Sequence, residues 1–252
     1  MHPLLDRPKP YILAHRGASD LAPENTLAAF TAAVEAGADI IETDLWFTAD
    51  GELVCHHDAT LKRMTGQTGR VDQTAARRVT ALPIQSRLGL RWQSERIPTL
   101  AQALDAIPMS VMLAVELKDP RFAQRAWAEK LARLVEARIE QRQVVALAFH
   151  RPRLDGVLRA CPSFPTGYIS VLEPMPVEHS QILGPFWPVL YANPGYVASA
   201  HRQGQWVCPL DTRPGKRLAH YLRLEVDAVM SNNPAALRVQ IDQLGAAAEA
   251  CR

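Results

Sequence analysis

The sequence predicts an α/β protein, a TIM (β/α)8 barrel that forms one domain over residues 1–252. Short aliphatic or β-branched runs alternate with amphipathic segments rich in Ala, Leu and Arg, as in βαβ units with a parallel sheet. Eight such units in about 250 residues are what a barrel requires. The chain is 48% hydrophobic, which is enough for a large core. A doubly wound open sheet has the same alternation and is the alternative.

The expected elements follow this alternation in chain order. Each strand is a short apolar run, and each helix is an amphipathic segment between two such runs. The expected strands are residues 11–14, 39–45, 111–116, 144–149, 166–171, 189–192, 206–209 and 227–230. The expected helices are 26–36, 100–106, 121–137, 153–160, 194–203 and 215–224, and the Ala-rich 245–250 would end a last one.

The segment at about 46–98 interrupts the alternation. It has a hairpin signal at Ala49-Asp50-Gly51, then turn-forming and polar residues, and no single clear helix. We interpret it as a small insertion after strand 2 that covers the carboxyl end of the barrel, where such folds keep their sites.

The charge and composition narrow the range of partners. The net charge is +2, with 28 basic and 26 acidic residues, so no strong field favours nucleic acid or an anionic membrane. The four cysteines lie far apart and are expected to be reduced thiols. Residues 1–10 contain no apolar signal region, and no run suggests a membrane anchor, so we expect a cytoplasmic protein.

Three carboxylates at strand ends are candidate metal ligands. Glu42 and Asp44 are two residues apart on one strand and face the same side. Glu116 ends another apolar run. Close carboxylates repel by roughly 4 kcal/mol per pair at 4 Å, so a fold that gathers them needs a cation. Oxygen ligands suit Mg²⁺ or Ca²⁺. The alternative is that Asp44 starts a loop and Glu42 forms an ordinary salt bridge.

Two cationic residues and one imidazole accompany these acids. His15 and Arg16 follow the first strand and precede Gly17, which permits a sharp turn beneath a ligand. Arg16 is suited to grip a phosphate with two hydrogen bonds, and His15 to transfer a proton. Lys118 lies two residues beyond Glu116 and would either pair with that acid or face an anionic oxygen.

His57 is the second candidate for proton transfer. In an extended segment only one of His56 and His57 can face the site, and the preceding apolar order favours His57. Asp58 could either hold the His57 ring or brace the loop. Trp206 could form a wall for a small polyol, although a buried Trp is more often part of the core. The segment Pro23-Glu24-Asn25-Thr26 is interpreted as the start of a helix, not as a catalytic element.

At these residues the sequence resembles the glycerophosphodiester phosphodiesterase family. The similar motifs keep their order and approximate spacing over almost the whole chain. They are His15-Arg16-Gly17, Pro23-Glu24-Asn25-Thr26, Glu42-x-Asp44, Asp50-Gly51 followed by His57-Asp58, Arg96-Ile97-Pro98-Thr99-Leu100, Glu116-x-Lys118, and a terminal Val226-Asp227 to Pro234.

The resemblance implies a barrel that binds one divalent cation through Glu42, Asp44 and Glu116, with His15 and His57 as acid and base. It implies hydrolysis of a glycerophosphodiester to sn-glycerol 3-phosphate and an alcohol. In the implied route the glycerol 2-hydroxyl attacks phosphorus, and water then opens the cyclic phosphate.

The chain departs from the family pattern at 206–209, where Trp-Val-Cys-Pro replaces Trp-Thr-Val-Asn, and at Ala148-Phe149, where Ser-Phe is usual. Both departures concern substrate preference. Two alternatives remain: a phosphodiesterase that acts on lysolipids, and an inactive protein that binds glycerophosphodiesters.

Overall fold

Eight parallel strands form the barrel in the computed structural model, which describes residues 8–85, 87–178 and 180–250. Residues 1–7 of the N-terminal segment and Cys251, which entered the predictions above, lie outside this range. The barrel strands are β1 (Tyr11–Ala14), β2 (Ile40–Phe47), β4 (Met112–Leu117), β5 (Val144–Ala148), β6 (Thr166–Ser170), β7 (Ile182–Pro185), β8 (Trp206–Val207) and β9 (Ala228–Ser231).

The strands follow the order β8-β7-β6-β5-β4-β2-β1-β9, and two hydrogen bonds join the β8 end of this series to the β9 end. The backbone N–H of Asp227, just before β9, donates to the carbonyl of Val207 in β8 at 2.9 Å. The Val207 N–H in turn donates to Asp227 Oδ2 at 2.7 Å. The TIM barrel prediction is therefore confirmed, and the open sheet is not.

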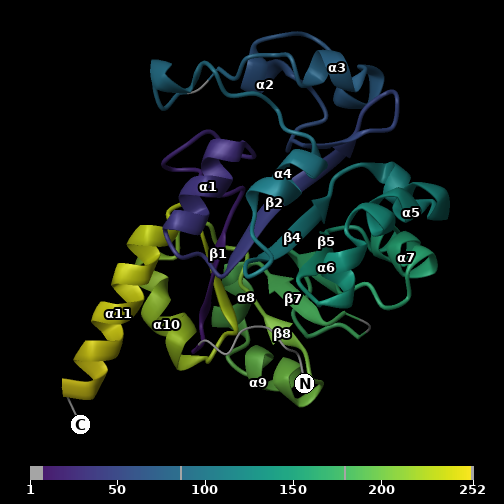
Figure 1. Ribbon diagram of the computed structural model, residues 1–252. Helices are drawn as coiled ribbons and strands as arrows, with labels where there is room; N and C mark the ends of the chain where they lie inside the picture. Colours follow the sequence, from purple (N-terminus) through teal and green to yellow (C-terminus); the bar gives the residue numbers. More distant parts are fainter. Residues whose placement is uncertain (1–7, 86, 179, 251–252) are drawn as a thin grey trace.

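Helices cover the outside of the barrel (Figure 1). Thr26 caps the first helix and Thr99 forms a capping box with Gln102, so both helices begin where their polar residues satisfy free N–H groups. The helices are α1 (Leu27–Glu35), α4 (Leu100–Ala106), α5 (Arg125–Leu134), α6 (Glu136–Glu140), α7 (Arg151–Ala160), α8 (Trp187–Ala192), α9 (Tyr196–Arg202), α10 (Leu218–Arg223) and α11 (Pro234–Ala250), with 3₁₀ turns η3 (Pro120–Ala123) and η4 (Gly215–Arg217).

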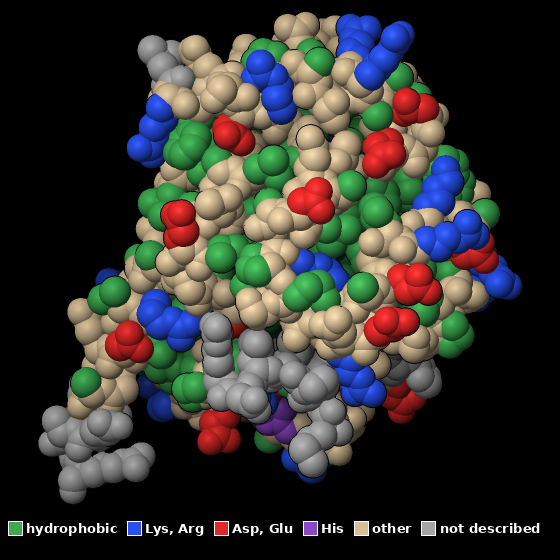
Figure 2. Space-filling model, in the orientation of Figure 1, with side chains coloured by type: hydrophobic (Ala, Val, Ile, Leu, Met, Phe, Trp, Pro, Cys, Tyr) green, Lys and Arg blue, Asp and Glu red, His purple; other side chains and the backbone are tan. Residues whose placement is uncertain are grey.

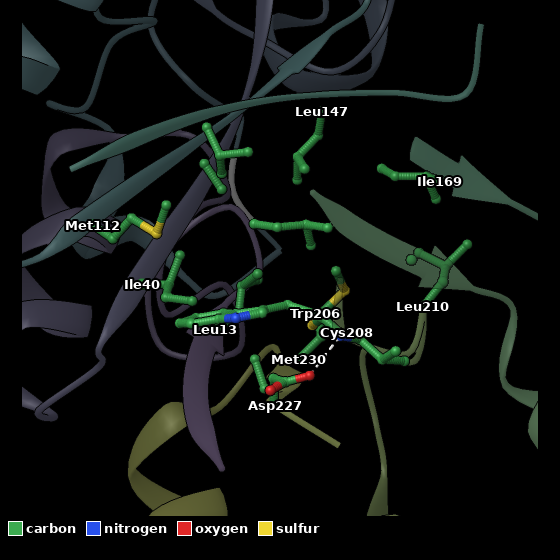
Figure 3. Close-up of a pocket in the computed structure, with 16 residues that line it drawn as sticks. Leu13, Ile40, Met112, Leu147, Ile169, Trp206, Cys208, Leu210, Asp227 and Met230 are labelled. Carbon is green, nitrogen blue, oxygen red and sulfur yellow. Dashed lines mark hydrogen bonds between the residues drawn. The ribbon is translucent and has the colours of Figure 1, made fainter. Parts of the chain in front are cut away.

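The strands are apolar on both sides, because one side fills the barrel and the other packs under the helices. In β1, Leu13 belongs to the interior cluster and Ile12 to the cluster beneath the outer helices. The interior narrows to an apolar cavity of about 40 Å³, shown in Figure 3, to which Met112, Leu147 and Met230 contribute. A space this small identifies a packed core and not a channel.

The segment between β2 and α4 packs as a small unit beyond the carboxyl ends of β2 and β4 (Figure 1). Its hairpin is formed, since β3 (Leu53–Cys55) pairs antiparallel with the end of β2. Its other elements are α2 (Lys62–Thr65), η1 (Val71–Gln73), α3 (Ala76–Val79) and η2 (Leu90–Trp92). The unit has its own buried cluster, which includes Leu61, Val71 and Ile97.

Two element predictions are wrong in detail. Residues 189–192 belong to α8 and not to a strand, because Pro188 occupies the first turn of a helix that begins there. The sixth barrel strand is instead β7, which is difficult to predict from the sequence because Gly184 and Pro185 interrupt its apolar run. The long helix expected at 121–137 is divided into η3, α5 and part of α6.

The surface shows basic and acidic side chains interspersed over the face displayed in Figure 2. Among the described residues, no helix combines the length and the apolar character that crossing a bilayer demands. A cytoplasmic location remains a prediction.

Candidate functional site

The carboxyl ends of β2 and β4 bring three acidic side chains together. Asp44 and Glu116 are register partners on neighbouring parallel strands, and Glu42 lies two residues earlier on the same side as Asp44. Each offers an oxygen within 4.8 Å of the others, and all three residues are buried. These are the three metal ligands expected from the sequence.

Mutual repulsion among the three acids helps to raise the pKa values of Glu42 and Glu116. Burial raises the pKa of Glu42 well above its ordinary value, and the charges of Asp44 and Glu116 raise it further. Burial and the Asp44 charge raise the pKa of Glu116 to about 7. Asp44 differs, because the charges of Arg16 and Lys118 outweigh its burial and lower its pKa. The cluster therefore favours any added positive charge.

Two buried oxygens of the cluster lack hydrogen bonds. These are Glu42 Oε1 and Asp44 Oδ1, the latter with only Lys118 Nζ at 3.3 Å. Buried acceptors without a hydrogen bond are costly, and their presence here needs an explanation. Oxygen donors gathered in this way fit a hard divalent cation such as Mg²⁺ or Ca²⁺.

The two predicted cationic residues lie against the acids. Lys118 Nζ is 2.6 Å from Glu116 Oε1. Arg16 approaches Asp44 Oδ2 with Nε at 3.0 Å, and its backbone N–H donates to Glu42 Oε2 at 2.9 Å. Each side chain is only 16% exposed. Both cationic side chains therefore contact the acidic cluster and remain partly exposed to solvent.

The turn after β1 orients His15 and Arg16. Arg16 adopts a positive φ of 56°, and the following Gly17 has φ of 76°. A Cβ at Gly17 would lie 2.6 Å from the Ala29 carbonyl carbon, so only glycine fits here. His15 Nδ1 lies 2.8 Å from Asn232 Oδ1. Burial and the Arg16 charge lower the pKa of His15 to about 4.

The two adjacent histidines after β3 diverge as expected from their alternation. His56 is buried, and its Nε2 lies 3.0 Å from the carbonyl of Thr60. His57 is 32% exposed, and its Nδ1 lies 2.7 Å from Asp58 Oδ1. His57 is also near enough to Asp44 to contribute to lowering the pKa of that carboxyl. The structure therefore places His57, not His56, on the side of the acidic cluster.

Trp206 is the one proposed site residue that the structure does not bring to this edge. It is the first residue of β8, and its ring stacks on Tyr11, the first residue of β1, at 5.5 Å between centroids. Figure 3 shows it lining the interior cavity beside Asp227. The first residues of parallel strands lie at the amino end of a barrel, opposite the acidic cluster, so the expected wall for substrate is not there.

Two polar residues of the site, Asn25 and Asn232, were not predicted. Asn25 was interpreted as part of a helix start, but its amide donates to Asp44 Oδ2 at 2.8 Å and accepts from Thr43 Oγ1 at 2.7 Å. Asn232 contacts His15, as described above. The Pro-Glu-Asn-Thr motif was a signal for Asn25, whereas no local pattern indicates the role of Asn232.

The comparisons with known proteins agree with this geometry. The model of the glycerophosphoryl diester phosphodiesterase family matches residues 15–236. The chain is 29% identical over 238 residues to a glycerophosphodiester phosphodiesterase of Caldanaerobacter subterraneus subsp. tengcongensis, covering 91% of this chain and 96% of the relative.

Solved structures show the same fold. A glycerophosphodiester phosphodiesterase from Agrobacterium tumefaciens has a TM-score of 0.78 at 27% identity, covering 90% of this chain and 98% of that one. A phosphodiesterase from Oleispira antarctica, solved with sn-glycerol-3-phosphate, has a TM-score of 0.80 at 24% identity over 92% of this chain and 97% of its own. The chain therefore belongs to the glycerophosphoryl diester phosphodiesterase family and is a hydrolase of glycerophosphodiesters.

Proposed function

We propose that this chain is a metal-dependent enzyme that converts a small glycerophosphodiester to sn-glycerol 3-phosphate and a free alcohol. The observation that supports this most is the set of three buried carboxylates, two of which have an oxygen without a hydrogen bond, bordered by two cations and two imidazoles. This arrangement suits a reaction in which negative charge builds up on phosphoryl oxygens.

Glu42, Asp44 and Glu116 would hold one divalent cation, either Mg²⁺ or Ca²⁺. When bound, the cation would supply positive charge that polarises a phosphoryl oxygen. Arg16 and Lys118 would supply further positive charge to the phosphoryl group, since each has a cationic group beside the cluster and is partly exposed to solvent. A single preorganised group in such a position can contribute about 3–4 kcal/mol to stabilising the transition state.

His15 and His57 are the proposed proton carriers. His15 is neutral at pH 7 because its pKa is about 4, so it can take the proton of the glycerol 2-hydroxyl as that oxygen attacks phosphorus. The phosphorus–oxygen bond to the alcohol then breaks, and His57 gives a proton to the departing oxygen. Water opens the resulting cyclic phosphate to glycerol 3-phosphate, with the proton transfers reversed.

The direct test is product release by the purified protein. With glycerophosphoethanolamine and Mg²⁺ or Ca²⁺, we expect glycerol 3-phosphate, measured by a coupled dehydrogenase assay, and loss of activity with EDTA. Undiminished release after thorough chelation would contradict the metal role. Tight binding of the diester without turnover would indicate a binding protein, and preference for lysophosphatidylethanolamine would indicate a lysolipid enzyme.

The histidine roles need variants of their own. His15→Ala and His57→Ala should each lose at least about 100-fold in kcat, as the loss of general acid–base catalysis usually implies. His56→Ala changes a neighbouring imidazole that hydrogen-bonds within its own segment, so its kcat should fall far less. Equal losses in all three variants would contradict the assignment.

A further inference from the structure

A chain of charged side chains joins the segment that carries His57 to the barrel. Arg63, on α2, donates from Nε to Asp58 Oδ2 at 2.6 Å. Its Nη1 and Nη2 donate to the two oxygens of Glu24 at 2.9 and 2.8 Å. Asp58 Oδ1 is bonded to His57 Nδ1, and Glu24 Oε1 also accepts from Arg16 Nη1 at 2.9 Å. Arg63 thus connects Asp58, which binds His57, to Glu24, which binds Arg16.

We infer that Arg63 is a positioning residue for the reaction: by holding Asp58 against His57 and anchoring both to Glu24, it sets the orientation of the His57 ring. The inference rests on the proposed function, in which His57 transfers a proton. Arg63 itself need touch neither the substrate nor the metal.

The two oxygens of the Asp58 carboxylate bind different residues, His57 and Arg63, and this explains how Arg63 acts. Hydrogen bonds from Arg63 and His57 outweigh partial burial and lower the pKa of Asp58 to about 2, so this group is an ionised acceptor at neutral pH. An ionised carboxylate only accepts, and therefore His57 Nδ1 must carry the hydrogen of their shared bond. The other ring nitrogen, Nε2, is then the one available for proton transfer.

The contact with Glu24 explains why this support is needed. His57 follows β3, which pairs only with β2 among the described strands and is not part of the closed barrel. Arg63 grips Glu24 with two parallel hydrogen bonds across 39 residues of sequence, and such forks fix direction as well as distance. Glu24 is tied through Arg16 to the same turn that carries His15.

The same segment contains a matched control. Arg70 bonds Asp72 through Nε at 2.9 Å, with side chains 42% and 27% exposed. In the Arg63–Asp58 pair, the side chains are 40% and 26% exposed. The two pairs thus share chemistry and exposure, but Arg70–Asp72 has no contact with a site residue among the interactions described. Differences between their variants therefore report the connection to His57 and not the loss of an exposed ion pair.

The test compares Arg63→Met, Arg63→Lys and Arg70→Met in steady-state hydrolysis of glycerophosphoethanolamine. Arg63→Met should lower kcat by about 10- to 100-fold, because small misplacements of a reacting group have effects of this size. KM should stay within about threefold, since no substrate contact is lost. Arg63→Lys should recover part of kcat, because an ammonium can hold one carboxylate but not fork between two. Arg70→Met should match the unmutated protein.

A second readout does not depend on activity. Two-bond ¹⁵N–¹H correlations of the His57 ring, assigned with His57→Asn, report its tautomer. When the ring is neutral, we expect its hydrogen on Nδ1 in the unmutated protein and in Arg70→Met, and a tautomer mixture in Arg63→Met. The charged ring that donates a proton in the proposed reaction carries a second hydrogen, on Nε2. An unchanged tautomer in a folded Arg63→Met protein would overturn the inference, as would kcat within twofold of the unmutated value.

The two readouts separate this inference from the proposed function. If the unmutated protein releases no glycerol 3-phosphate, the proposed function fails, and the tautomer still decides the role of Arg63. If Arg63→Met melts several degrees below Arg70→Met, Asp58→Asn provides a second variant, since it removes the ionised acceptor of His57 Nδ1 while Arg63 keeps its two hydrogen bonds to Glu24. The same tautomer change is expected there, and an unchanged ring would contradict the inference.

Discussion

The two ends of the barrel bury carboxylates in opposite ways. At the amino end, Asp227 is 1% exposed, and both of its oxygens are used: one pairs with Lys9, and the other binds His201 Nε2 at 2.9 Å and the Val207 N–H at 2.7 Å. At the carboxyl end, Glu42 and Asp44 are equally buried, yet each has an oxygen without a hydrogen bond.

This difference teaches how to tell a structural acid from a functional one. A buried carboxylate with every oxygen satisfied stabilises the fold, as Asp227 does by closing β8 onto β9. Buried carboxylates that repel one another and keep oxygens without hydrogen bonds reduce stability unless a ligand compensates them. Burial alone does not distinguish the two ends, whereas the hydrogen bonds do.

The largest expected effect is on catalysis at the carboxyl end. Glu42→Gln should lower kcat/KM for a glycerophosphodiester by at least about 100-fold while the chelated protein stays folded, because it removes one charge from a repelling cluster. Kinetics with Mg²⁺ and thermal melts in EDTA measure the two quantities. Full activity in this variant would remove Glu42 from the metal site.

At the amino end the same chemical change should act on stability instead. Asp227→Asn removes a buried charged acceptor from Lys9, His201 and the Val207 N–H and should lower the free energy of unfolding by about 2 kcal/mol, as the loss of hydrogen bonds to a charged group does. Urea denaturation measures this loss. The folded fraction should keep its kcat, and a kcat loss comparable to that of Glu42→Gln would break the comparison.

The pH dependence of stability sharpens the contrast. Glu116 binds its proton more tightly in the folded protein (pKa about 7) than at its ordinary value of 4.5, so its favourable contribution is present below 4.5 and lost as pH rises through 7. In EDTA, Glu116→Gln should therefore be more stable than the unmutated protein by about 3 kcal/mol at pH 8 and by less than about 1 at pH 5.

The control for this prediction is the metal itself. Saturating Mg²⁺ should stabilise the unmutated protein at pH 8 and have a smaller effect on Glu116→Gln, because a ligand that binds only the folded state shifts unfolding by mass action. A pH-independent difference between the two chelated proteins would show that Glu116 does not repel its neighbours.

The smallest expected effect concerns Trp206. Because its ring stacks on Tyr11 at the amino end, Trp206→Phe should change kcat and KM by less than about twofold. Steady-state kinetics on the same substrate tests this. A KM increase of tenfold would restore the sequence-based view that Trp206 contacts substrate.

Much of the site could be predicted from the sequence because its residues follow recognisable strands. Alternation places Glu42 and Asp44 on one side, and parallel strands bring Glu116 level with them. The predicted substrate contact of Trp206 was wrong because it was inferred from the residue type. The position of Trp206 as the first residue of a strand indicates the opposite end of the barrel. The strand β7 was missed because its Gly and Pro lack the propensity of a buried run.

The remaining contacts depend on side chains distant in sequence. Asn232 meets His15 across 217 residues, and Arg63 meets Glu24 across 39. No local pattern specifies such pairs, because they arise only when the barrel has closed and the hairpin has docked. The same holds for the hydrogen bonds that separate Asp227 from Glu42.

The pairing of β3 with the upper part of β2 has a consequence for how this enzyme can vary. β2 carries Glu42 and Asp44, two of the proposed cation ligands. Its antiparallel neighbour β3 leads directly into the loop that carries His57. Their mutual spacing is thus built into a single ladder of adjacent backbone groups. Sequence changes outside β2, β3 and β4 can therefore accumulate without altering this backbone register.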